Sequence, residues 1–456
     1  MDSVTNFDAI VIGAGQAGPP LAKRLTKAGM SVAIVERHLF GGTCVNTGCI
    51  PTKAMVASAY VAHVARRADE YGVRVGGSVT VDLKTVMARK GAIAERSRIG
   101  IEKMLRSLER CSVYKGHARF LSAHEIGVGD ATLQADRVFI NVGGRASIPA
   151  LPGLDRVPYL TNSSMMHLDV APPHLAIVGG SYVGLEFGQM FRRFGSDVTV
   201  IEMAPRLVQR EDADVSTAIQ DILMREGIAV RLNACCVSVS PGNAGVALQV
   251  DCAEGSPTIE ASHLLLAVGR RPNTDDLGLD EAGVARDDDG YIVVDDRLQT
   301  SVPGIWALGE CNGKGAFTHT AYNDFEIVAS NILDGATRRV SDRIPAYALY
   351  IDPPLGRAGL TETEARQRGH AVRVGTRAMA RVGRAFEKGE TNGLMKIVVD
   401  ADSLEILGAA VLGTGGDEVI HCVLDTMYAR APYAALKRAV HIHPTVSEYI
   451  PSLLEN

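Results

Sequence analysis

The chain has 456 residues, a formal net charge of −5 and a composition that is 46% hydrophobic. This length predicts two or three domains with ample core. The small net charge gives no electrostatic basis for binding nucleic acid or an anionic membrane, and no apolar run approaches the roughly 18 residues of a membrane span. The N-terminus does not resemble a secretory signal. We therefore expect a cytoplasmic protein with no nucleic-acid or membrane partner.

The N-terminal region carries a complete dinucleotide-binding pattern. A buried parallel strand is predicted over 7–12, because the run is short and apolar. Three glycines follow it: Gly13, Gly15 and Gly18. A helical stretch to Gly29, a second strand over 31–35 and Glu36 complete the pattern. The glycines allow a tight turn and close approach of a pyrophosphate to the helix N-terminus, and Glu36 can accept a ribose hydroxyl.

The next segment holds two of the eight cysteines, Cys44 and Cys49. On a regular helix, two residues five positions apart are separated by a rise of about 7.5 Å. This exceeds the Cα–Cα distance of roughly 4.4–6.8 Å that a disulfide requires. We expect Gly48 to supply a bend and Pro51 to open a new helix, so that Cys49 lies at a helix N-terminus, where a thiolate is favoured. Lys53 adds positive charge one turn later. The pattern predicts a reactive, closable dithiol; two reduced core cysteines are the alternative.

The dinucleotide pattern recurs in the middle of the chain. A strand over 174–178 leads into Gly179 and Gly184, and a helix, a second strand and Glu202 follow. The distance from first glycine to acid is 23 positions in both copies (36 − 13 and 202 − 179). The chain is therefore predicted to bind two dinucleotides. Ser181 replaces the middle glycine of the second copy, so its backbone is expected to approach a phosphate less closely.

The other elements follow from periodicity and turn residues. Helices are predicted over 51–67, 82–109, 208–227 and 417–430. Strands are predicted over 112–142, 228–266, 394–399 and 406–412. The sequence texture changes near Asp342, which predicts the start of a last domain.

Together these features resemble the FAD-dependent pyridine nucleotide–disulfide oxidoreductases, a family that includes dihydrolipoamide dehydrogenase, glutathione reductase and the mercuric reductases. The resemblance covers essentially the whole chain. It rests on the segment 42–53, both nucleotide patterns, the segments 269–273 and 309–310, and the terminal residues His443, Pro444, Thr445 and Glu448.

The resemblance implies an α/β fold with two Rossmann-like dinucleotide-binding domains, one for FAD and one for NAD(P), and a C-terminal α+β dimerisation domain. The FAD-binding domain would comprise 1–158 and 274–340, the NAD(P)-binding domain 159–273, and the dimerisation domain 341–456. The last domain would form a homodimer.

The resemblance also implies the catalytic roles. Cys49 would lie beside the flavin ring, and Cys44 would exchange with the substrate. Lys53 would approach the flavin N5 edge and pair with Glu186.

A histidine from the second subunit would complete the active site. His443 would manage protons as thiols form and break, and the Glu448 carboxylate would fix its tautomer and raise its basicity. His441 is expected to be structural.

The implied cofactor-binding residues include the glycines and acids of both patterns. They are Gly13, Gly15, Gly18, Glu36, Arg37, Gly42, Thr43, Lys53, Gly143, Gly179, Gly184, Glu202, Gly269, Arg270, Gly309 and Glu310. Gly309 and Glu310 would meet the ribityl and pyrophosphate region of FAD. Family members usually carry Asp at the position of Glu310, so the extra methylene alters the geometry of that contact.

The implied reaction moves two electrons between a nicotinamide, FAD, the Cys44–Cys49 couple and an external small-molecule or carrier-bound dithiol or disulfide, as in dihydrolipoamide dehydrogenase. NADH is favoured over NADPH, because Glu202 repels a 2′-phosphate, although Arg206 would attract one. The chain lacks the C-terminal cysteine pair of mercuric reductases, yet the run 350–356 resembles the mercuric- and copper-reductase-like branch. A reductase of Hg(II), Cu(II) or a stress-related substrate is the alternative, and a non-catalytic redox sensor is a remote one.

Two further residue groups have open interpretations. Cys235 and Cys236 could bind a soft metal, but buried thiols are more usual in such a strand, and no metal site is predicted. Tyr182 could gate the nicotinamide pocket or simply pack.

Overall fold

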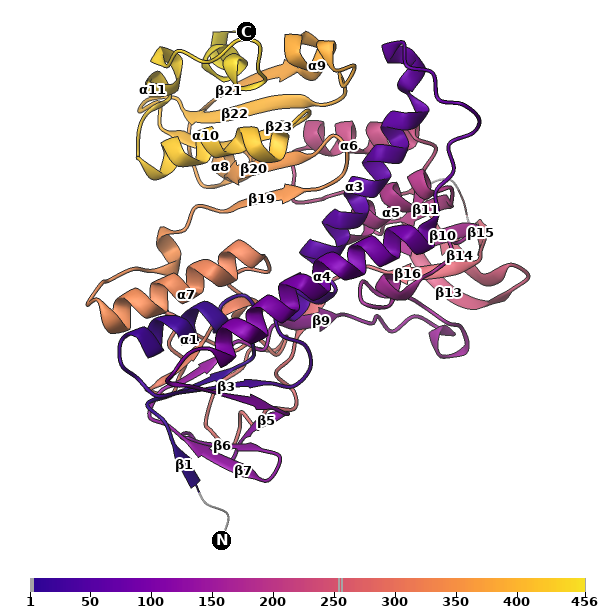
Figure 1. Ribbon diagram of the computed structural model, residues 1–456. Coiled ribbons are helices and arrows are strands. Elements are labelled where there is room, and N and C mark those ends of the chain that lie inside the picture. The colour runs from indigo at the N-terminus through magenta and orange to yellow at the C-terminus, as the bar shows by residue number, and fades with distance from the viewer. Residues whose placement is uncertain (1–3, 253–254, 256, 456) are drawn as a thin grey trace. The chain divides into compact units, whose positions relative to one another are not determined.

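A computed structural model describes residues 4–252, 255 and 257–455, without the side chains of Cys236 and Val237 (Figure 1). The chain forms two compact units. The first comprises Met1–Ala54, Met87–Ser147 and Gly269–Arg343, and the second comprises Met55–Val86, Ile148–Val268 and Ile344–Asn456. The boundaries of the three predicted domains stay a prediction.

The first unit is built on a parallel sheet of five short strands in the order β18-β8-β2-β3-β4. These strands are β2 (Ala9–Ile12), β3 (Val32–Glu36), β4 (Cys111–Lys115), β8 (Val138–Ile140) and β18 (Ile305–Ala307). Helices α1 (Gly18–Lys27) and α7 (Thr318–Leu333) lie side by side (Figure 1) and bury Leu21, Leu25 and Ile327 with Val11 of the sheet. All of β2 is buried, because helices and a second sheet cover its two faces.

The second sheet of this unit covers the opposite side chains of β2. Its strands are β1 (Val4–Asn6), β7 (Ala131–Gln134), β6 (Glu125–Val128) and β5 (Ala118–Phe120), in that order. Ile10 and Ile12 pack in one cluster with Phe120, Ile126 and Leu133. A two-stranded ladder of β9 (Gly144–Ala146) and β17 (Arg270–Pro272) completes the sheets of the unit. Its helices also include α2 (Gly42–Asn46), the start of α3 (Cys49–Arg66) and most of α4 (Leu83–Arg106).

The second unit repeats the parallel plan on a smaller scale. Its parallel sheet has the order β12-β11-β10-β16. The strands are β10 (His174–Val178), β11 (Asp197–Ile201), β12 (Ala229–Arg231) and β16 (His263–Leu266). Helix α5 (Tyr182–Phe194) connects β10 to β11. A three-stranded antiparallel sheet of β13 (Cys235–Gly242), β14 (Gly245–Asp251) and β15 (Thr258–Ala261) packs in the same core.

The C-terminal part of this unit is an antiparallel sheet in the order β19-β20-β23-β22-β21. The strands are β19 (Ala346–Leu349), β20 (Leu355–Gly359), β21 (Val372–Ala378), β22 (Leu394–Asp400) and β23 (Ile406–Leu412). Helix α10 (Gly416–Tyr428) packs Ile420 and Val423 on it, and the last turn-rich segment η7 (Ser447–Glu455) adds Leu453. The α/β class with two Rossmann-like parts and a C-terminal α+β part is therefore confirmed.

One predicted helix begins in the wrong place. The helix expected over 208–227 is α6, Ala213–Arg225. Val208 has a φ of +46° and Asp212 is extended at the helix N-cap, so the preceding residues form a loop. The apolar pattern misled the prediction, because Leu207 and Val208 are buried from a loop rather than from a helical turn.

Candidate active site

The two cysteines flank a break between two helices. Cys44 lies in α2 and Cys49 is the first residue of α3, as the prediction of a thiol at a helix start required. Gly48 makes the break possible, because an added Cβ there would lie 2.8 Å from the carbonyl oxygen of Thr43. Its φ is not positive, so close packing, and not the unusual backbone conformation that we expected, requires glycine here. Pro51 lies in the first turn of α3, as predicted.

The two sulfur atoms belong to one small polar group in the first unit. The Cys49 sulfur lies 3.3 Å from the Thr318 hydroxyl at the start of α7. The hydrogen bond with Cys49 and burial raise the pKa of Cys44, while Thr318 and Lys53 oppose that rise. The protonated thiol of Cys44 is therefore favoured. Nothing in the sequence around Thr318 marked it, because it comes to the dithiol from far along the chain.

The first glycine-rich loop has no room for side chains on its inner surface. Gly13 has a φ of +102°, and a Cβ there would lie 2.3 Å from the carbonyl oxygen of Asn141. A Cβ on Gly18 would lie 2.2 Å from the Gly13 carbonyl oxygen, and one on Gly42 would lie 3.0 Å from Gly15 Cα. Such a bare backbone turn at a helix N-terminus is what a pyrophosphate requires. These residues fit the diphosphate of a dinucleotide.

Glu36 closes the same loop from the end of β3. Its carboxylate accepts hydrogen bonds from the Ala14 N–H at 2.9 Å and the His38 N–H at 2.8 Å. Its position at the carboxyl end of a parallel strand is where a ribose is bound in such folds. The neighbouring Arg37 is turned to an acid of its own unit, with Nη1 2.8 Å from Asp276 Oδ2.

Glu310 and Arg270 form an ion pair that the sequence did not predict. Arg270 Nε and Nη2 donate to the two Glu310 carboxylate oxygens at 2.5 and 2.9 Å, and Nη2 also donates to the Gly144 carbonyl at 2.6 Å. A Cβ on Gly144 would lie 2.8 Å from the Glu310 carboxyl carbon. The longer acid is thus held by an arginine, and the altered contact of Glu310 with FAD stays a prediction.

Three further predicted cofactor glycines share a positive φ. They are Gly143 (+63°), Gly269 (+126°) and Gly309 (+74°). Gly309 donates its N–H to the buried Asp324 at 2.8 Å, and Asp324 also pairs with Arg343. Burial raises the pKa of Asp324, and the arginine opposes that rise. Thr43 caps the turn of α2 through its carbonyl, which accepts from Thr47 N–H at 2.9 Å.

The second glycine-rich loop repeats the first in the other unit. Gly179 has a φ of +116°, and a Cβ there would lie 2.3 Å from the Ala267 carbonyl oxygen. A Cβ on Gly184 would lie 2.0 Å from the Gly179 carbonyl oxygen. Glu202 accepts from the Gly180 N–H at 2.6 Å and from the N–H two residues after itself at 2.8 Å. The predicted doubling of the nucleotide-binding pattern is therefore visible in matching backbone geometry.

The partners predicted for one another at the flavin lie in different units. Lys53 belongs to the first unit and Glu186, on α5, to the second, so their ion pair stays a prediction. Glu186 is 6% exposed, and its carboxylate accepts from the Tyr350 N–H at 3.0 Å. Tyr182, at the start of the same helix, packs edge-on against Tyr347 at a centroid distance of 5.4 Å.

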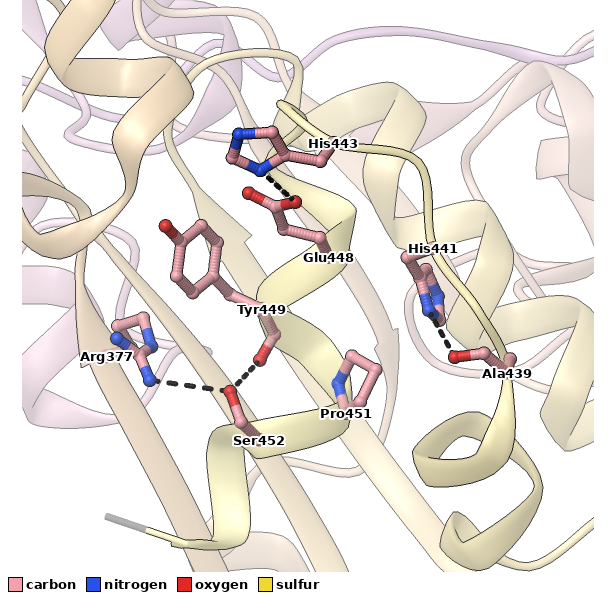
Figure 2. A pocket seen from close by; sticks show the side chains of 8 residues that line it. All are labelled: Arg377, Ala439, His441, His443, Glu448, Tyr449, Pro451 and Ser452. Carbon is pink, nitrogen blue, oxygen red and sulfur yellow. Dashed lines mark hydrogen bonds and ion pairs between the residues drawn. The ribbon is translucent and has the colours of Figure 1, made fainter.

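The C-terminal histidine and glutamate are in contact. His443 Nδ1 lies 2.9 Å from Glu448 Oε2. The His443 side chain is 81% exposed and Glu448 is 14% exposed, so an exposed imidazole contacts a half-buried carboxylate. The pair lines a cavity of about 460 Å³ together with Arg377, His441, Tyr449 and other residues. Figure 2 shows these side chains. Sequence reasoning did not find Arg377 or Tyr449.

The described residues hold no group of three or more His, Cys, Asp and Glu side chains arranged for a metal ion. Among the same residues, no helix is both long and apolar enough to cross a bilayer. The predicted Cys235–Cys236 pair lies partly outside the described side chains. Cys235 itself is exposed, so it is not the buried strand thiol that we expected.

Comparison with known proteins defines the class. The model of the pyridine nucleotide-disulphide oxidoreductases matches residues 7–324, and that of their dimerisation domain matches residues 345–453. The chain belongs to this family of FAD-binding disulfide oxidoreductases, and the dimerisation domain supports a homodimer.

Individual relatives cover the whole chain. It is 34% identical to the probable pyridine nucleotide-disulfide oxidoreductase RclA of Escherichia coli, over 99% of both chains. It is 33% identical to the mercuric reductase of Streptomyces lividans, over 97% of this chain and 94% of the relative. It is also 33% identical to the dihydrolipoyl dehydrogenase of Thermus scotoductus, over 97% and 95%. The solved structure of RclA in its Cu(II) complex superposes with a TM-score of 0.89 at 33% identity, covering 99% of both chains.

Proposed function

We propose that the protein is an NADH-dependent reductase of external disulfides that works through the Cys44–Cys49 couple, and that it runs in reverse on dithiols of the dihydrolipoyl type. The observation that carries the proposal is the contact between the exposed imidazole of His443 and the half-buried carboxylate of Glu448. Such a pair is a base whose tautomer is fixed, which is what thiol–disulfide exchange needs.

The proposed exchange consists of two successive thiol–disulfide displacements. His443 of the second subunit takes the proton of Cys44, whose thiolate attacks one sulfur of the substrate disulfide, and the leaving thiolate takes that proton from His443. Cys49 then passes its proton to His443 and attacks the Cys44 sulfur. The second substrate sulfur leaves as a thiolate and takes that proton, and the Cys44–Cys49 disulfide is closed. Two electrons and two protons pass to the substrate. The raised pKa of Cys44 explains why a base is required.

FAD, when bound, exchanges a hydride with the nicotinamide and an electron pair with the dithiol. The first unit would hold it through the bare glycine turn and Glu36. The second unit would hold the nicotinamide nucleotide through Gly179, Gly184 and Glu202. Glu202 supports NADH, because a carboxylate at the ribose repels a 2′-phosphate.

A substrate panel tests the proposal. Purified enzyme with NADH is given lipoamide, glutathione disulfide, Hg(II) or Cu(II) under identical conditions. We expect the highest kcat/KM for the reduction of the lipoamide disulfide. His443→Ala should lower that value by about a hundredfold or more, the usual range for a general base. His370→Ala is the matched control, since it removes a partly exposed imidazole that is paired with a carboxylate, Asp400, and does not line the cavity. Equal losses in both variants would disprove the role of His443.

The role of Cys44 is tested separately. Cys44→Ser should abolish lipoamide turnover and leave reduction of the flavin by NADH intact, followed by the bleaching of flavin absorbance. Cys422→Ser, which changes a partly buried thiol of α10, controls for the loss of any cysteine. If Cys44→Ser also blocks flavin reduction, Cys44 is not the outer thiol.

A metal reductase is the second candidate, and the likeness to RclA supports it. That relative matches over its whole length, and its solved structure is a Cu(II) complex. A dithiol with an exposed sulfur suits a soft or borderline metal ion as substrate. Faster NADH oxidation with Cu(II) or Hg(II) than with lipoamide, dependent on Cys44 but insensitive to His443→Ala, would favour this function over the first.

A further inference from the structure

The cavity beside His443 has a second functional side chain, Arg377. It lies on the edge strand β21, and its guanidinium carbon sits 4.8 Å from the centre of the Tyr449 ring. The Tyr449 hydroxyl in turn accepts the Gly383 N–H at 3.3 Å, which fixes the ring. Figure 2 shows Arg377 and the His443–Glu448 pair on either side of Tyr449. The arginine is therefore held in place by stacking on an anchored aromatic ring.

Arg377 has no carboxylate partner among the residues that the structure describes. Its Nη2 donates to the Ser452 hydroxyl at 3.4 Å, near the limit of a hydrogen bond, and its buried Nε has no acceptor among those residues. A buried donor without an acceptor is costly. The guanidinium therefore has one unmet donor, and no carboxylate of the described residues is paired with its charge.

One acidic side chain, Glu448, lines the cavity together with Arg377. Its Oε2 lies against His443 and its Oε1 has no hydrogen-bond partner among the described residues, so neither oxygen pairs with Arg377 there. His441 also lines the cavity and is turned to the Ala439 carbonyl at 3.3 Å. The pocket thus presents a fixed cation beside the proposed base, with room for a small organic molecule.

We propose that this cavity binds the carboxylate of a small dithiol or disulfide substrate, with Arg377 as the anchoring residue. A guanidinium presents a planar fork of donors that matches a carboxylate in two parallel hydrogen bonds. The inference rests on the proposed disulfide reductase function, because Arg377 would bind the carboxylate of a substrate whose sulfur exchanges a proton with His443. It selects free, acidic substrates over neutral amides of the same dithiol.

The test compares two substrates that differ only in this charge, dihydrolipoate and dihydrolipoamide. We expect the wild-type holoenzyme to have the higher kcat/KM for the acid, and the ratio of acid to amide to fall about tenfold in Arg377→Met, as loss of a charge-assisted pair predicts. Arg377→Lys should keep part of the ratio, because it keeps the charge but not the fork. Arg373→Met, an exposed arginine on the same strand and side of β21, is the matched control.

An unchanged ratio in an active Arg377→Met enzyme overturns the proposal, and so does a change that follows dimer dissociation in light scattering, which would make Arg377 an interface cation. If the wild type turns over neither dithiol, the proposed function fails by itself. Calorimetric titration of the oxidised holoenzyme with lipoate, which needs no turnover, then decides the pocket: binding at least about tenfold weaker in Arg377→Met supports it, and equal binding refutes it.

Discussion

The two glycine-rich loops, one in each unit, share a backbone plan but start their helices differently. In both, the first glycine donates its N–H to the second strand at 2.8 Å, and the terminal acid accepts two N–H groups. Yet α5 begins at Tyr182, while α1 begins at Gly18, two positions later in the pattern. The glycine turn is thus conserved within the molecule, and the helix start is not.

Two prolines explain the later start of α1. Pro19 and Pro20 occupy its first turn and have no N–H, so neither can bond to a carbonyl four residues earlier. The first such bond is Leu21 N–H to the Ala17 carbonyl at 3.2 Å. In the second loop the equivalent N–H groups are present, and helical bonding starts from the Ser181 carbonyl. The turn therefore requires residues without a side chain, whereas the start of the helix requires residues that have a backbone N–H donor.

The largest effect on nucleotide binding should come from adding a side chain at the third glycine of each loop. Gly18→Ala and Gly184→Ala each place a Cβ within about 2 Å of a carbonyl oxygen, 2.2 and 2.0 Å respectively, which forces the backbone apart. Overpacking of this kind costs roughly 1–3 kcal/mol. We expect Gly18→Ala to lose bound FAD on gel filtration and Gly184→Ala to keep it but lose reduction by NADH. The ratio of flavin to protein absorbance and the NADH titration measure the two effects.

A matched position without close neighbours serves as the control. Gly29→Ala alters a glycine of the first unit that has nothing within 4 Å of an added Cβ, although its φ of +92° adds strain. Loss of flavin in Gly184→Ala as well as in Gly18→Ala would contradict the assignment of one nucleotide to each loop.

Substituting the acid of each loop should have a smaller effect, Glu36 on FAD binding and Glu202 on the choice of nicotinamide nucleotide. Glu36→Gln and Glu202→Gln each replace one accepting oxygen by an NH₂ group that faces a backbone N–H, at a cost of about 1–3 kcal/mol. Glu36→Gln is expected to raise the FAD dissociation constant about tenfold. Glu202→Gln is expected to raise the ratio of kcat/KM for NADPH over NADH, since it removes a charge that repels a 2′-phosphate. A wild type that already prefers NADPH would refute that reading of Glu202.

Breaking the Arg270–Glu310 ion pair of the first unit should have a still smaller effect. Glu310→Asp shortens the acid and opens the double contact with Arg270, so the free energy of unfolding of the apoprotein should fall by about 1 kcal/mol. Glu326→Asp, in a more exposed pair with Arg338, should change it by less than about 0.5 kcal/mol. Chemical denaturation of both variants gives the comparison, and equal effects would show that the Arg270 contact contributes nothing particular.

The elements that the sequence predicted are those fixed by local pattern. The strands and glycines of both loops, Glu36, Glu202 and the helix start at Cys49 depend on residues within a few tens of positions. Long-range contacts were missed, because no periodicity reports them: Thr318 beside Cys49, Arg270 on Glu310 and Arg377 on Tyr449. The start of α6 was missed for another reason, since a buried loop has the same apolar residues as a helix face.

The smallest expected effect is that of Ser181→Gly, which tests whether the serine weakens nucleotide binding by the second loop. Ser181 has a φ of −117° and a ψ of −167°, extended backbone that any residue adopts, so glycine is not needed there. Ser181→Gly should change the KM for NADH by no more than about twofold, within the usual range for a substitution without a specific contact.

The reciprocal change is not equivalent. At Gly15 a Cβ would lie 3.3 Å from the Asn141 amide nitrogen, so Gly15→Ser should weaken FAD binding while Ser181→Gly leaves NADH binding unchanged. Tightening of NADH binding by about tenfold in Ser181→Gly would instead mean that the serine holds the phosphate away from the backbone, as its sequence position suggested. The asymmetry follows from what surrounds each turn: the first loop packs against Asn141 and Gly42, and the second leaves its middle residue extended.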